Sequence, residues 1–287
     1  MEFQNTTTPA QALPEMPAAP AAENAMVRLS GVSKHYGKKA AVIDLSLTVR
    51  SGEVFAFLGP NGAGKTTTLK MTTGLLRCDT GEIDVCGYRM SDQDELAKQH
   101  IAYVPDQPFL YDKLTGREFI HFARDLYGVP AEVAAARLAD LTERLDMIGF
   151  LDQLTESYSH GMKQKVALAA ALIHAPRLLV VDEPIVGLDP RTIRVIKTIF
   201  REIADAGGTV FMCTHTLDVA ESVADRLAII NQGRLIAQGS MDELRAMGER
   251  DDRLEDIFLS LTGATFGGPA TRDGWWVADT ADGESAA

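Results

Sequence analysis

The most constraining stretch of this 287-residue chain is a glycine-rich loop at residues 59–67, with the sequence GPNGAGKTT. The apolar run 54–58 precedes it and a helix-compatible segment around Leu69 follows, which predicts a strand, a loop and a helix start in that order. Glycine lets the backbone curl so that successive N–H groups point inward, and the first helical turn adds its own unpaired N–H groups. The stretch therefore predicts a phosphate-binding loop.

Two side chains of this loop carry chemistry of their own. Lys65 can reach the β- and γ-phosphates of a nucleotide as a point charge, and the Thr66 hydroxyl is placed to ligate a Mg²⁺ that bridges them. An ordinary glycine-rich turn is the alternative, and the flanking strand and helix argue against it. The residues that we expect to bind nucleotide here are Gly59, Pro60, Asn61, Gly62, Ala63, Gly64, Lys65, Thr66 and Thr67.

Composition places the chain among ordinary globular proteins, with 46% hydrophobic and 24% charged residues. Its longest apolar run, residues 166–173, is too short to cross a bilayer, and residues 1–27 lack the charged and apolar regions of a secretory signal. Three cysteines without metal-ligand spacing suit reduced, packed thiols. A net charge of −12 argues against a nucleic-acid partner. We therefore expect a cytosolic protein that does not itself insert into a membrane.

Hydrophobic periodicity predicts an α/β fold with a mainly parallel core sheet and an N-terminal antiparallel part. Thr115 and Glu118 form a predicted capping box at the start of one helix. Strands are expected within 26–49 as an antiparallel pair, and at 54–58, 83–85, 101–104, 178–181, 209–213, 226–230 and 235–238. Helices are expected over about 115–126, 131–145, 192–206 and 217–224, after Ser159, and after Ser240.

The same pass divides the chain into three parts. Residues 1–25 contain almost no large apolar side chain, so we expect a disordered extension. A folded domain is expected over 26–247, with an inserted helical subdomain at about 107–158. Residues 248–287 are expected to be partly flexible, with one short helix near 254–261 and an exposed aromatic pair at Trp275-Trp276.

Polar residues gather at the predicted carboxyl ends of the buried strands, where ligands of open α/β sheets bind. Asp182 and Glu183 follow the strand at 178–181, so one carboxylate can orient Mg²⁺ while the other faces an attacking water. A solvated acidic turn is the alternative. His215 follows the strand at 209–213 and can hydrogen-bond a γ-phosphate there, although a lone histidine is more often structural.

Three further residues have a functional and a purely structural interpretation. Ser159 and Gly161 at a helix start can form a second anion site, or Ser159 can simply cap the helix. Tyr36, at the bend between the first two strands, can stack on an adenine ring or anchor the turn. Taken one by one, these residues favour the structural interpretation.

Taken in order, the motifs resemble the ATP-binding cassette of ABC transporters, from about residue 26 to residue 244. In this resemblance the loop at 59–67 is the Walker A motif, 178–182 is Walker B and Glu183 is the catalytic carboxylate. The resemblance also implies that Tyr36 stacks on adenine, that Asp189 is the D-loop aspartate and that His215 is the switch histidine.

The resemblance further implies partners. Residues 158–162 occupy the position of the family signature, which closes over the nucleotide of another subunit, so Ser159, Gly161 and Asp189 are expected to act in trans. A homodimer or heterodimer of cassettes would then hold ATP and Mg²⁺ at its interface. An integral membrane permease is the other implied partner, which would place the chain at the inner face of the cell membrane.

The chain departs from the family pattern at three positions. Asp106 stands where the family usually has a glutamine; a carboxylate there can still approach Mg²⁺, although it adds negative charge near the γ-phosphate. His160 and Met162 replace a glycine and a glutamine of the signature. The implied metal ligands are Thr66 and Asp182, with Asp106 as a third candidate.

The resulting expectation is an ATPase subunit that powers transport of an unidentified substrate. Residues 159–164 and 108–118 resemble the exporter-type branch of bacterial cassettes, so export is favoured over import. A soluble ABC-type ATPase with a regulatory role is the alternative, against which stand the single cassette and the lack of heptads. The intact Glu183 and His215 argue against a non-hydrolysing docking module. No guanine-reading Asn-Lys-x-Asp motif supports a GTPase, and no acceptor-binding lid supports a kinase.

Overall fold

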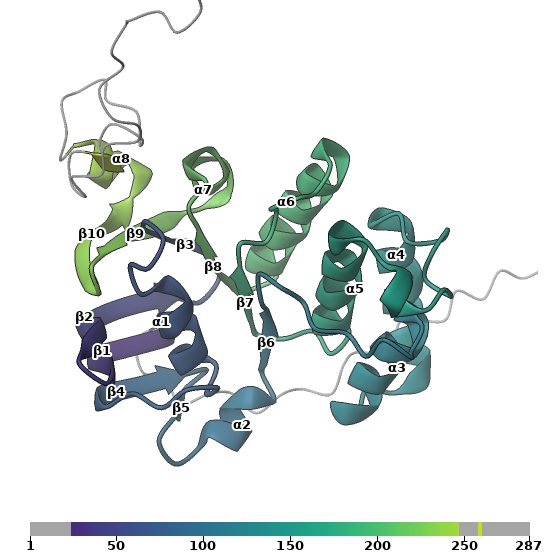
Figure 1. The fold of residues 1–287 in the computed structure, drawn as a ribbon, viewed down its shortest axis with the longest axis horizontal. Coiled ribbons are helices and arrows are strands. Elements are labelled where there is room, and N and C mark those ends of the chain that lie inside the picture. Colours follow the sequence, from purple (N-terminus) through teal and green to yellow (C-terminus); the bar gives the residue numbers. More distant parts are fainter. Residues whose placement is uncertain (1–23, 247–257, 260–287) are drawn as a thin grey trace, which may run out of the picture.

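The computed structural model describes residues 24–246 and 258–259 (Figure 1). The expectations for residues 1–23, the short helix near 254–261 and the Trp275-Trp276 pair lie wholly or largely outside the described residues. In chain order the elements are β1 (Ala25–Tyr36), β2 (Lys39–Arg50), β3 (Val54–Leu58), α1 (Lys65–Thr72), β4 (Thr80–Val85), β5 (Tyr88–Arg89), α2 (Asp94–Lys98), β6 (Ile101–Val104), α3 (Gly116–Leu126), α4 (Ala131–Arg144), the 3₁₀ turn η1 (Thr155–Ser157), α5 (His160–Leu172), β7 (Leu178–Asp182), α6 (Pro190–Asp205), β8 (Thr209–Thr214), α7 (Leu217–Val223), β9 (Arg226–Asn231), β10 (Arg234–Ser240) and α8 (Met241–Arg245).

Two sheets organise the molecule, and they confirm the predicted α/β fold. The six-stranded sheet has the order β10-β9-β3-β8-β7-β6, parallel except for the β9–β10 pair. The four-stranded sheet has the order β2-β1-β4-β5 and is antiparallel throughout. Helix α1 lies beside the antiparallel sheet, whereas α3 to α6 gather on the other side of the core sheet (Figure 1).

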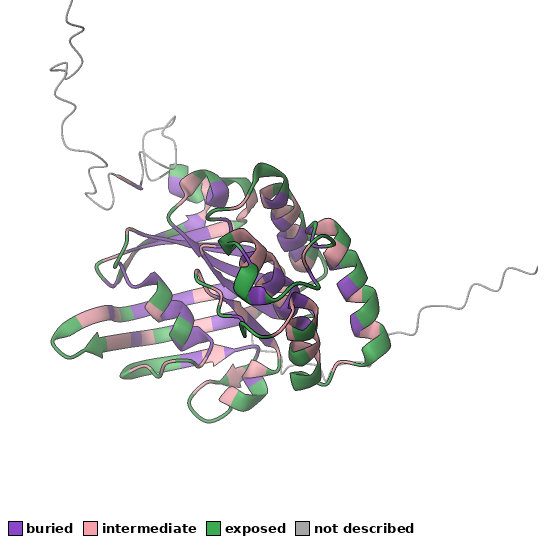
Figure 2. Cartoon of the chain, turned by 45° about the vertical axis from the view of Figure 1, so that its right-hand side comes forward, coloured by how far each residue is buried: buried purple, intermediate pink, exposed green. Residues whose placement is uncertain are grey.

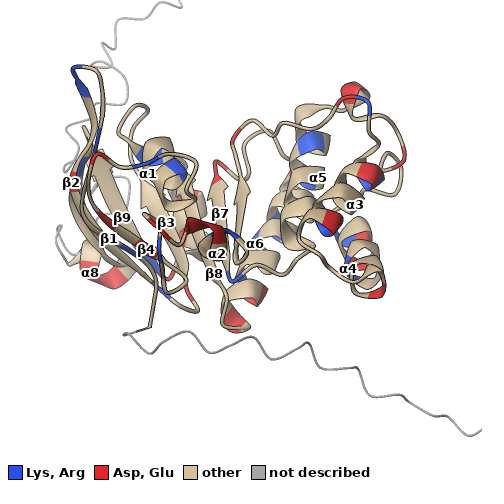
Figure 3. Ribbon diagram, turned by 90° about the horizontal axis from the view of Figure 1, so that it is seen from below, with Lys and Arg blue, Asp and Glu red and all other residues tan. Residues whose placement is uncertain are grey.

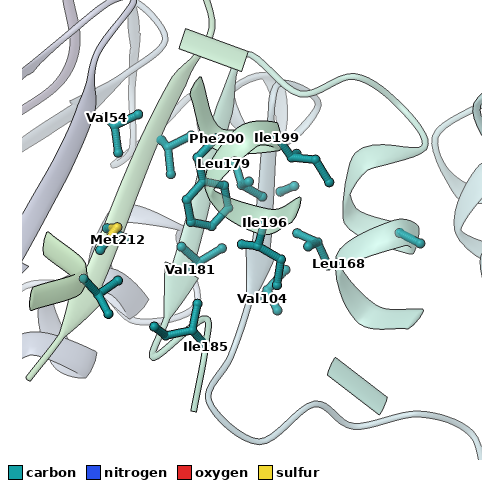
Figure 4. Packing of buried hydrophobic residues seen from close by; sticks show 14 of the residues in the cluster. Val54, Val104, Leu168, Leu179, Val181, Ile185, Ile196, Ile199, Phe200 and Met212 are labelled. Carbon is teal, nitrogen blue, oxygen red and sulfur yellow. The ribbon is translucent and has the colours of Figure 1, made fainter. Parts of the chain in front are cut away.

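Successive side chains of a strand point to opposite faces of the sheet. The core sheet is buried on both faces, because a hydrophobic cluster covers each of them. In β3, Val54, Ala56 and Leu58 join a cluster with helices α3 to α6, while Phe55 and Phe57 join a second cluster with α1 and the antiparallel sheet. Figure 4 shows the first cluster, in which strand side chains meet α5 and α6. Figure 2 shows the central strands as the buried interior, whereas the outer strands carry exposed residues as well. The carboxyl ends of β3, β7 and β8 are thereby fixed relative to one another.

Most elements appear where periodicity predicts them, and four differ. The capping box of Thr115 and Glu118 is confirmed. Helix α6 begins at Pro190, two residues before the predicted start, because Asp189 caps it and proline suits the first helical position. The strand expected at 83–85 begins at Thr80. Periodicity predicts no element in the polar stretch before β6, whereas the structure has β5 and α2 there.

The composition gave two expectations, one for membrane-spanning segments and one for the cysteines, and the described residues bear on both. No helix among residues 24–246 and 258–259 is both long and apolar enough to span a membrane. The three cysteines are free thiols: Cys86 and Cys213 are buried, and Cys78 is partly buried against the second cluster. Acidic and basic residues are interspersed along α3 and α4 (Figure 3).

Candidate active site

The glycine-rich loop lies between β3 and α1, at the carboxyl edge of the core sheet. Gly62 and Gly64 have φ angles of 79° and 113°, which residues with a Cβ rarely adopt. A Cβ at Gly59 would lie 2.4 Å from the carbonyl oxygen of Ile230, and one at Gly64 would lie 2.5 Å from that of Ala41. The glycines therefore allow the loop to curl tightly against β2 and β9.

Lys65 turns its side chain into this loop. Its Nζ donates to the carbonyl oxygens of Gly59 at 2.7 Å and of Pro60 at 3.3 Å, and the residue is only 7% exposed. The Ala63 amide donates to the same Pro60 oxygen at 3.1 Å and closes the turn. A phosphate bound at the start of α1 would compete with these carbonyl oxygens for the ammonium group.

Asp182, at the end of β7, meets the loop through Thr66. The Thr66 hydroxyl donates to Asp182 Oδ2 at 2.7 Å, and Asp182 is only 3% exposed. Burial raises the pKa of Asp182, the bond from Thr66 opposes the rise, and the charges of Glu183 and Asp106 add to it. A hydroxyl and a carboxylate side by side are oxygen ligands of the kind that Mg²⁺ prefers, so the donor set fits that ion.

Glu183 directly follows β7, and residues at the end of β8 hold its side chain. Its Oε1 lies 2.7 Å from His215 Nδ1, its Oε2 accepts from the Thr214 hydroxyl at 3.0 Å, and its amide donates to the Cys213 carbonyl oxygen at 2.9 Å. The backbone of Glu183 has a φ of 51°, a left-handed conformation that costs a residue with a Cβ roughly 1–2 kcal/mol. These contacts offset that cost and join Glu183 to His215.

A cleft of about 290 Å³ opens over the loop. Most of the residues predicted to bind nucleotide, metal or water line it. Gly59, Pro60 and Ala63 belong to the loop but do not line the cleft, and His215 reaches it only through Glu183. The lining residues are Tyr36, Lys39, Ala41, Asn61, Gly62, Gly64, Lys65, Thr66, Thr67, Asp106, Asp182 and Glu183.

Ser159, Gly161 and Asp189 lie elsewhere, and none of them lines the cleft of its own chain. Ser159 caps α5, because its hydroxyl accepts from the Met162 amide at 3.3 Å, and it is exposed. Asp189 caps α6 and accepts from the Thr192 hydroxyl at 2.6 Å and amide at 2.9 Å. These two bonds lower the pKa of Asp189 to about 2.

Gly161 and the loop before α6 are in contact. A Cβ at Gly161 would lie 3.3 Å from Leu188 Cδ2, and one at Gly187 would lie 3.3 Å from the ring of His160. The Lys165 ammonium lies 4.0 Å from Asp189 Oδ2. The start of α5 and the start of α6 therefore form one surface, apart from the cleft.

Sequence reasoning missed three residues of the site. Lys39 and Ala41 line the cleft from the start of β2, and Thr214 bonds Glu183 from the end of β8. The lysine pair Lys38-Lys39 at the start of β2 was a signal for Lys39. Thr214 directly precedes His215, but only the fold shows that its side chain points at a carboxylate.

The chain was compared with protein families and with curated proteins. The family model described as ABC transporter matches residues 42–186. The linearmycin resistance ATP-binding protein LnrL of Bacillus subtilis (strain 168) is 38% identical over 219 residues, which cover 76% of this chain and 70% of that protein. The daunorubicin/doxorubicin resistance ATP-binding protein DrrA of Streptomyces peucetius is 37% identical over 220 residues, covering 77% and 67%.

Solved structures agree with the match to the ABC transporter family model. A structure described as the ATP-binding subunit of an ABC transporter superimposes with a TM-score of 0.79 at 33% identity, covering 82% of this chain and 99% of that one. The cbiO1 protein of Clostridium perfringens, part of the ABC transporter complex cbiONQ, superimposes with a TM-score of 0.66 at 26% identity, covering 80% and 93%. The chain therefore belongs to the ABC transporter family, as an ATP-binding and ATP-hydrolysing subunit.

Proposed function

We propose that the cleft over the glycine-rich loop binds MgATP and that its hydrolysis powers export of a substrate through a separate membrane permease. One observation carries the proposal for the site. Asp182 is hydrogen-bonded to Thr66 of the loop at 2.7 Å, and Glu183, the next residue, lines the same cleft. Two carboxylates at the carboxyl end of β7 thereby lie close to the phosphate-binding end of α1.

The nucleotide would lie between Tyr36 and the loop. Tyr36 lines the cleft and is 52% exposed, so its ring is free to stack on an adenine. The loop amides and the start of α1 would receive the phosphates, and Lys65 would exchange its carbonyl partners for phosphate oxygens. Lys39, at the rim of the same cleft, adds a second positive charge.

Thr66 and Asp182 would hold Mg²⁺, and Asp106 lines the cleft as a third oxygen donor. When bound, the ion supplies positive charge that neutralises the phosphate oxygens. The buried Asp182 fits this role, because a cation would offset the cost of a charged carboxylate in the interior.

Glu183 would orient the attacking water and accept its proton, while His215 holds the carboxylate through Nδ1. The water oxygen forms a bond to the γ-phosphorus as the bond from that phosphorus to the β–γ bridging oxygen breaks, which yields ADP and phosphate. Lys65 and the loop amides stabilise the charge that develops.

A second cassette would complete the site. Ser159, Gly161 and Asp189 lie away from the cleft of their own chain, on the surface formed by the starts of α5 and α6. We propose that this surface faces the nucleotide of a partner cassette, identical or different. The exposed start of α5 supports this role, because a helix N-terminus favours phosphate.

The permease would dock on the helical part at about 107–158, within a proposed ATPase domain of 26–247. An apolar patch of Phe109, Tyr111, Phe122 and Leu126 lies there, with exposed fractions between 46% and 80%.

The names of the relatives, which concern resistance to linearmycin and daunorubicin/doxorubicin, support export. The proposed contact between the apolar patch and the permease would hold the chain at the cytoplasmic face of the membrane.

The substitution Glu183→Gln tests the proposal for the site. It keeps the shape of the side chain and one acceptor oxygen but removes its basicity. ATP turnover should fall by about 100-fold or more, while binding of a fluorescent ATP analogue in Mg²⁺ stays within about threefold of wild type. Turnover near the wild-type rate would remove Glu183 from this role.

A further inference from the structure

Thr214 occupies the middle of the site although no motif marks it. Its strand, β8, lies between β3 and β7 in the core sheet. Thr214 pairs with Leu58, the last residue before the loop, and Cys213 pairs with Asp182. Thr214 is fully buried, so its hydroxyl must find its partners within the protein. The residue therefore lies between the phosphate-binding loop and the two acids.

The Thr214 hydroxyl has a defined direction. It accepts from the Thr216 amide at 3.0 Å and donates to Glu183 Oε2 at 3.0 Å. A hydroxyl has one proton, and the Thr214 hydroxyl donates it to the carboxylate oxygen of Glu183. The other carboxylate oxygen, Oε1, is engaged by the His215 amide at 3.1 Å and by Nδ1 at 2.7 Å. The His215 amide reaches Oε2 only at 3.4 Å, so the Thr214 hydroxyl makes the shorter contact to that oxygen.

Glu183 needs such tethers. Its φ of 51° is unfavourable for a residue with a Cβ, and the following Pro184 restricts its backbone further. A glutamate side chain also has several rotatable bonds, and the short contacts of His215 are both to Oε1, so they hold Oε2 weakly. The bond from Thr214 holds Oε2 and thereby fixes the plane of the carboxylate.

We propose that Thr214 is a positioning residue for ATP hydrolysis, which acts by fixing the carboxylate plane of Glu183 at the rim of the cleft. The inference rests on the proposed role of Glu183. It goes beyond that role because it assigns a function to a buried side chain that does not line the cleft. A displacement of about 1 Å in a reacting group can cost roughly 100-fold in rate, so a single tether can matter.

The test compares three variants. Thr214→Val removes the hydroxyl and keeps the β-branched shape, while Thr214→Ser keeps the hydroxyl. Thr209→Val is the matched control: Thr209 lies on the same strand, is also fully buried, and donates to the Arg50 carbonyl oxygen at 3.1 Å, far from the acids. Steady-state ATP turnover, binding of a fluorescent ATP analogue and melting temperature are measured for each.

Thr214→Val should lower kcat by about 10- to 100-fold and leave nucleotide affinity within about threefold of wild type. Thr214→Ser should restore most of kcat, and Thr209→Val should lower the melting temperature without lowering kcat. Thr214→Ala replaces the valine variant if that protein is not recovered folded.

Two results would overturn the inference: a kcat of Thr214→Val within about twofold of wild type, or an equal loss of kcat in Thr209→Val. Failure of the serine variant to restore kcat would overturn it as well. Undiminished turnover in Glu183→Gln is a different outcome, because it removes the proposed role of Glu183 itself.

Discussion

At the scale of single residues, burial decides the chemistry of the two acids. Asp182 and Glu183 are adjacent in the chain, but Asp182 is turned into the core against Thr66 and Glu183 is held at the rim by Thr214 and His215. Burial raises the pKa of Asp182, so its charged form is unfavourable until a cation approaches. The fold therefore separates the acid that we propose to bind the metal from the one that we propose to orient the water.

Asp182→Asn should stabilise the chain while it disables the site. A raised pKa means that the folded protein holds this proton more tightly than the unfolded chain. The stabilisation is present below the unfolded pKa and is lost as pH rises through the folded pKa. At pH 7 the asparagine variant should therefore melt a few degrees higher and lose about 100-fold or more in Mg²⁺-dependent turnover.

Melting curves of both proteins at pH 7, without nucleotide or Mg²⁺, check the first half of this prediction. Turnover at saturating Mg²⁺ checks the second half. A lower melting temperature for the variant, with wild-type turnover, would mean that the Asp182 carboxylate is structural rather than a metal ligand.

Residue spacing predicted much of this site but not its internal contacts. Lys65 and Thr66 follow from the loop pattern, and Asp182 from its place at the end of a buried strand. The contact between Glu183 and Thr214 could not be predicted, because it depends on a left-handed φ at Glu183 that is unusual for any residue with a Cβ.

At the scale of elements, the starts of α5 and α6 form the surface that we propose to face a partner cassette. Ser159 caps α5 and Asp189 caps α6, and Gly161 lies against the loop that joins β7 to α6. A cap satisfies the free amides of a first helical turn, and the same amides can bind an anion. The observed cap is therefore compatible with the proposed role of Ser159 in binding a phosphate of the partner's nucleotide.

Ser159→Ala separates the two interpretations, with Ser240→Ala as the control. Ser240 caps α8 and accepts from the Glu243 amide at 3.2 Å, remote from the starts of α5 and α6. Both substitutions should cost about 1 kcal/mol of unfolding free energy through the lost cap. Only Ser159→Ala should also reduce ATP turnover, by about tenfold or more. Equal turnover in the two variants would leave Ser159 with capping alone.

Long elements were predictable from sequence and short ones were not. The helices after Ser159 and Thr115 have N-caps and periodic apolar residues, and the core strands are continuous apolar runs. Helix α2 spans five residues and buries only Ala97, so it leaves no periodic signal. Strand β5 spans two residues and exists only because it pairs with β4.

At the scale of the whole molecule, the site is joined to a helical region that presents an apolar patch. Phe109 lies near Tyr111, with ring centroids 6.0 Å apart, and Tyr111 lies near Phe122 at 5.7 Å. Asp106, which lines the cleft, stands three residues before Phe109 in the chain. One short segment thus runs from the nucleotide cleft to the proposed permease contact.

The double substitution Phe109→Asp with Leu126→Asp should detach the chain from membranes that carry its permease. Ile148→Asp is the matched control, because Ile148 is 72% exposed but lies outside the patch. The membrane-bound fraction should fall by about tenfold or more for the double variant only, since charges in an apolar contact oppose burial. Melting temperatures show that all variants are folded. Equal retention of the double variant would exclude the patch as the docking site.

The arrangement in trans is the central claim for the assembled molecule, and mixing two inactive variants tests it most directly. Lys65→Ala disables the nucleotide loop, and Ser159→Asp keeps a cap on α5 but repels a triphosphate. In a head-to-tail pair of one variant with the other, both defects fall in one site and the second site is intact.

The measurement is the ATP turnover of the two variants co-expressed with different tags, compared with each variant alone. Random pairing of two independent sites predicts recovery of about a quarter of wild-type turnover, although each variant alone is inactive. A mixture that contains mixed dimers and remains as inactive as its components would contradict the account, because each chain would then use only its own Ser159.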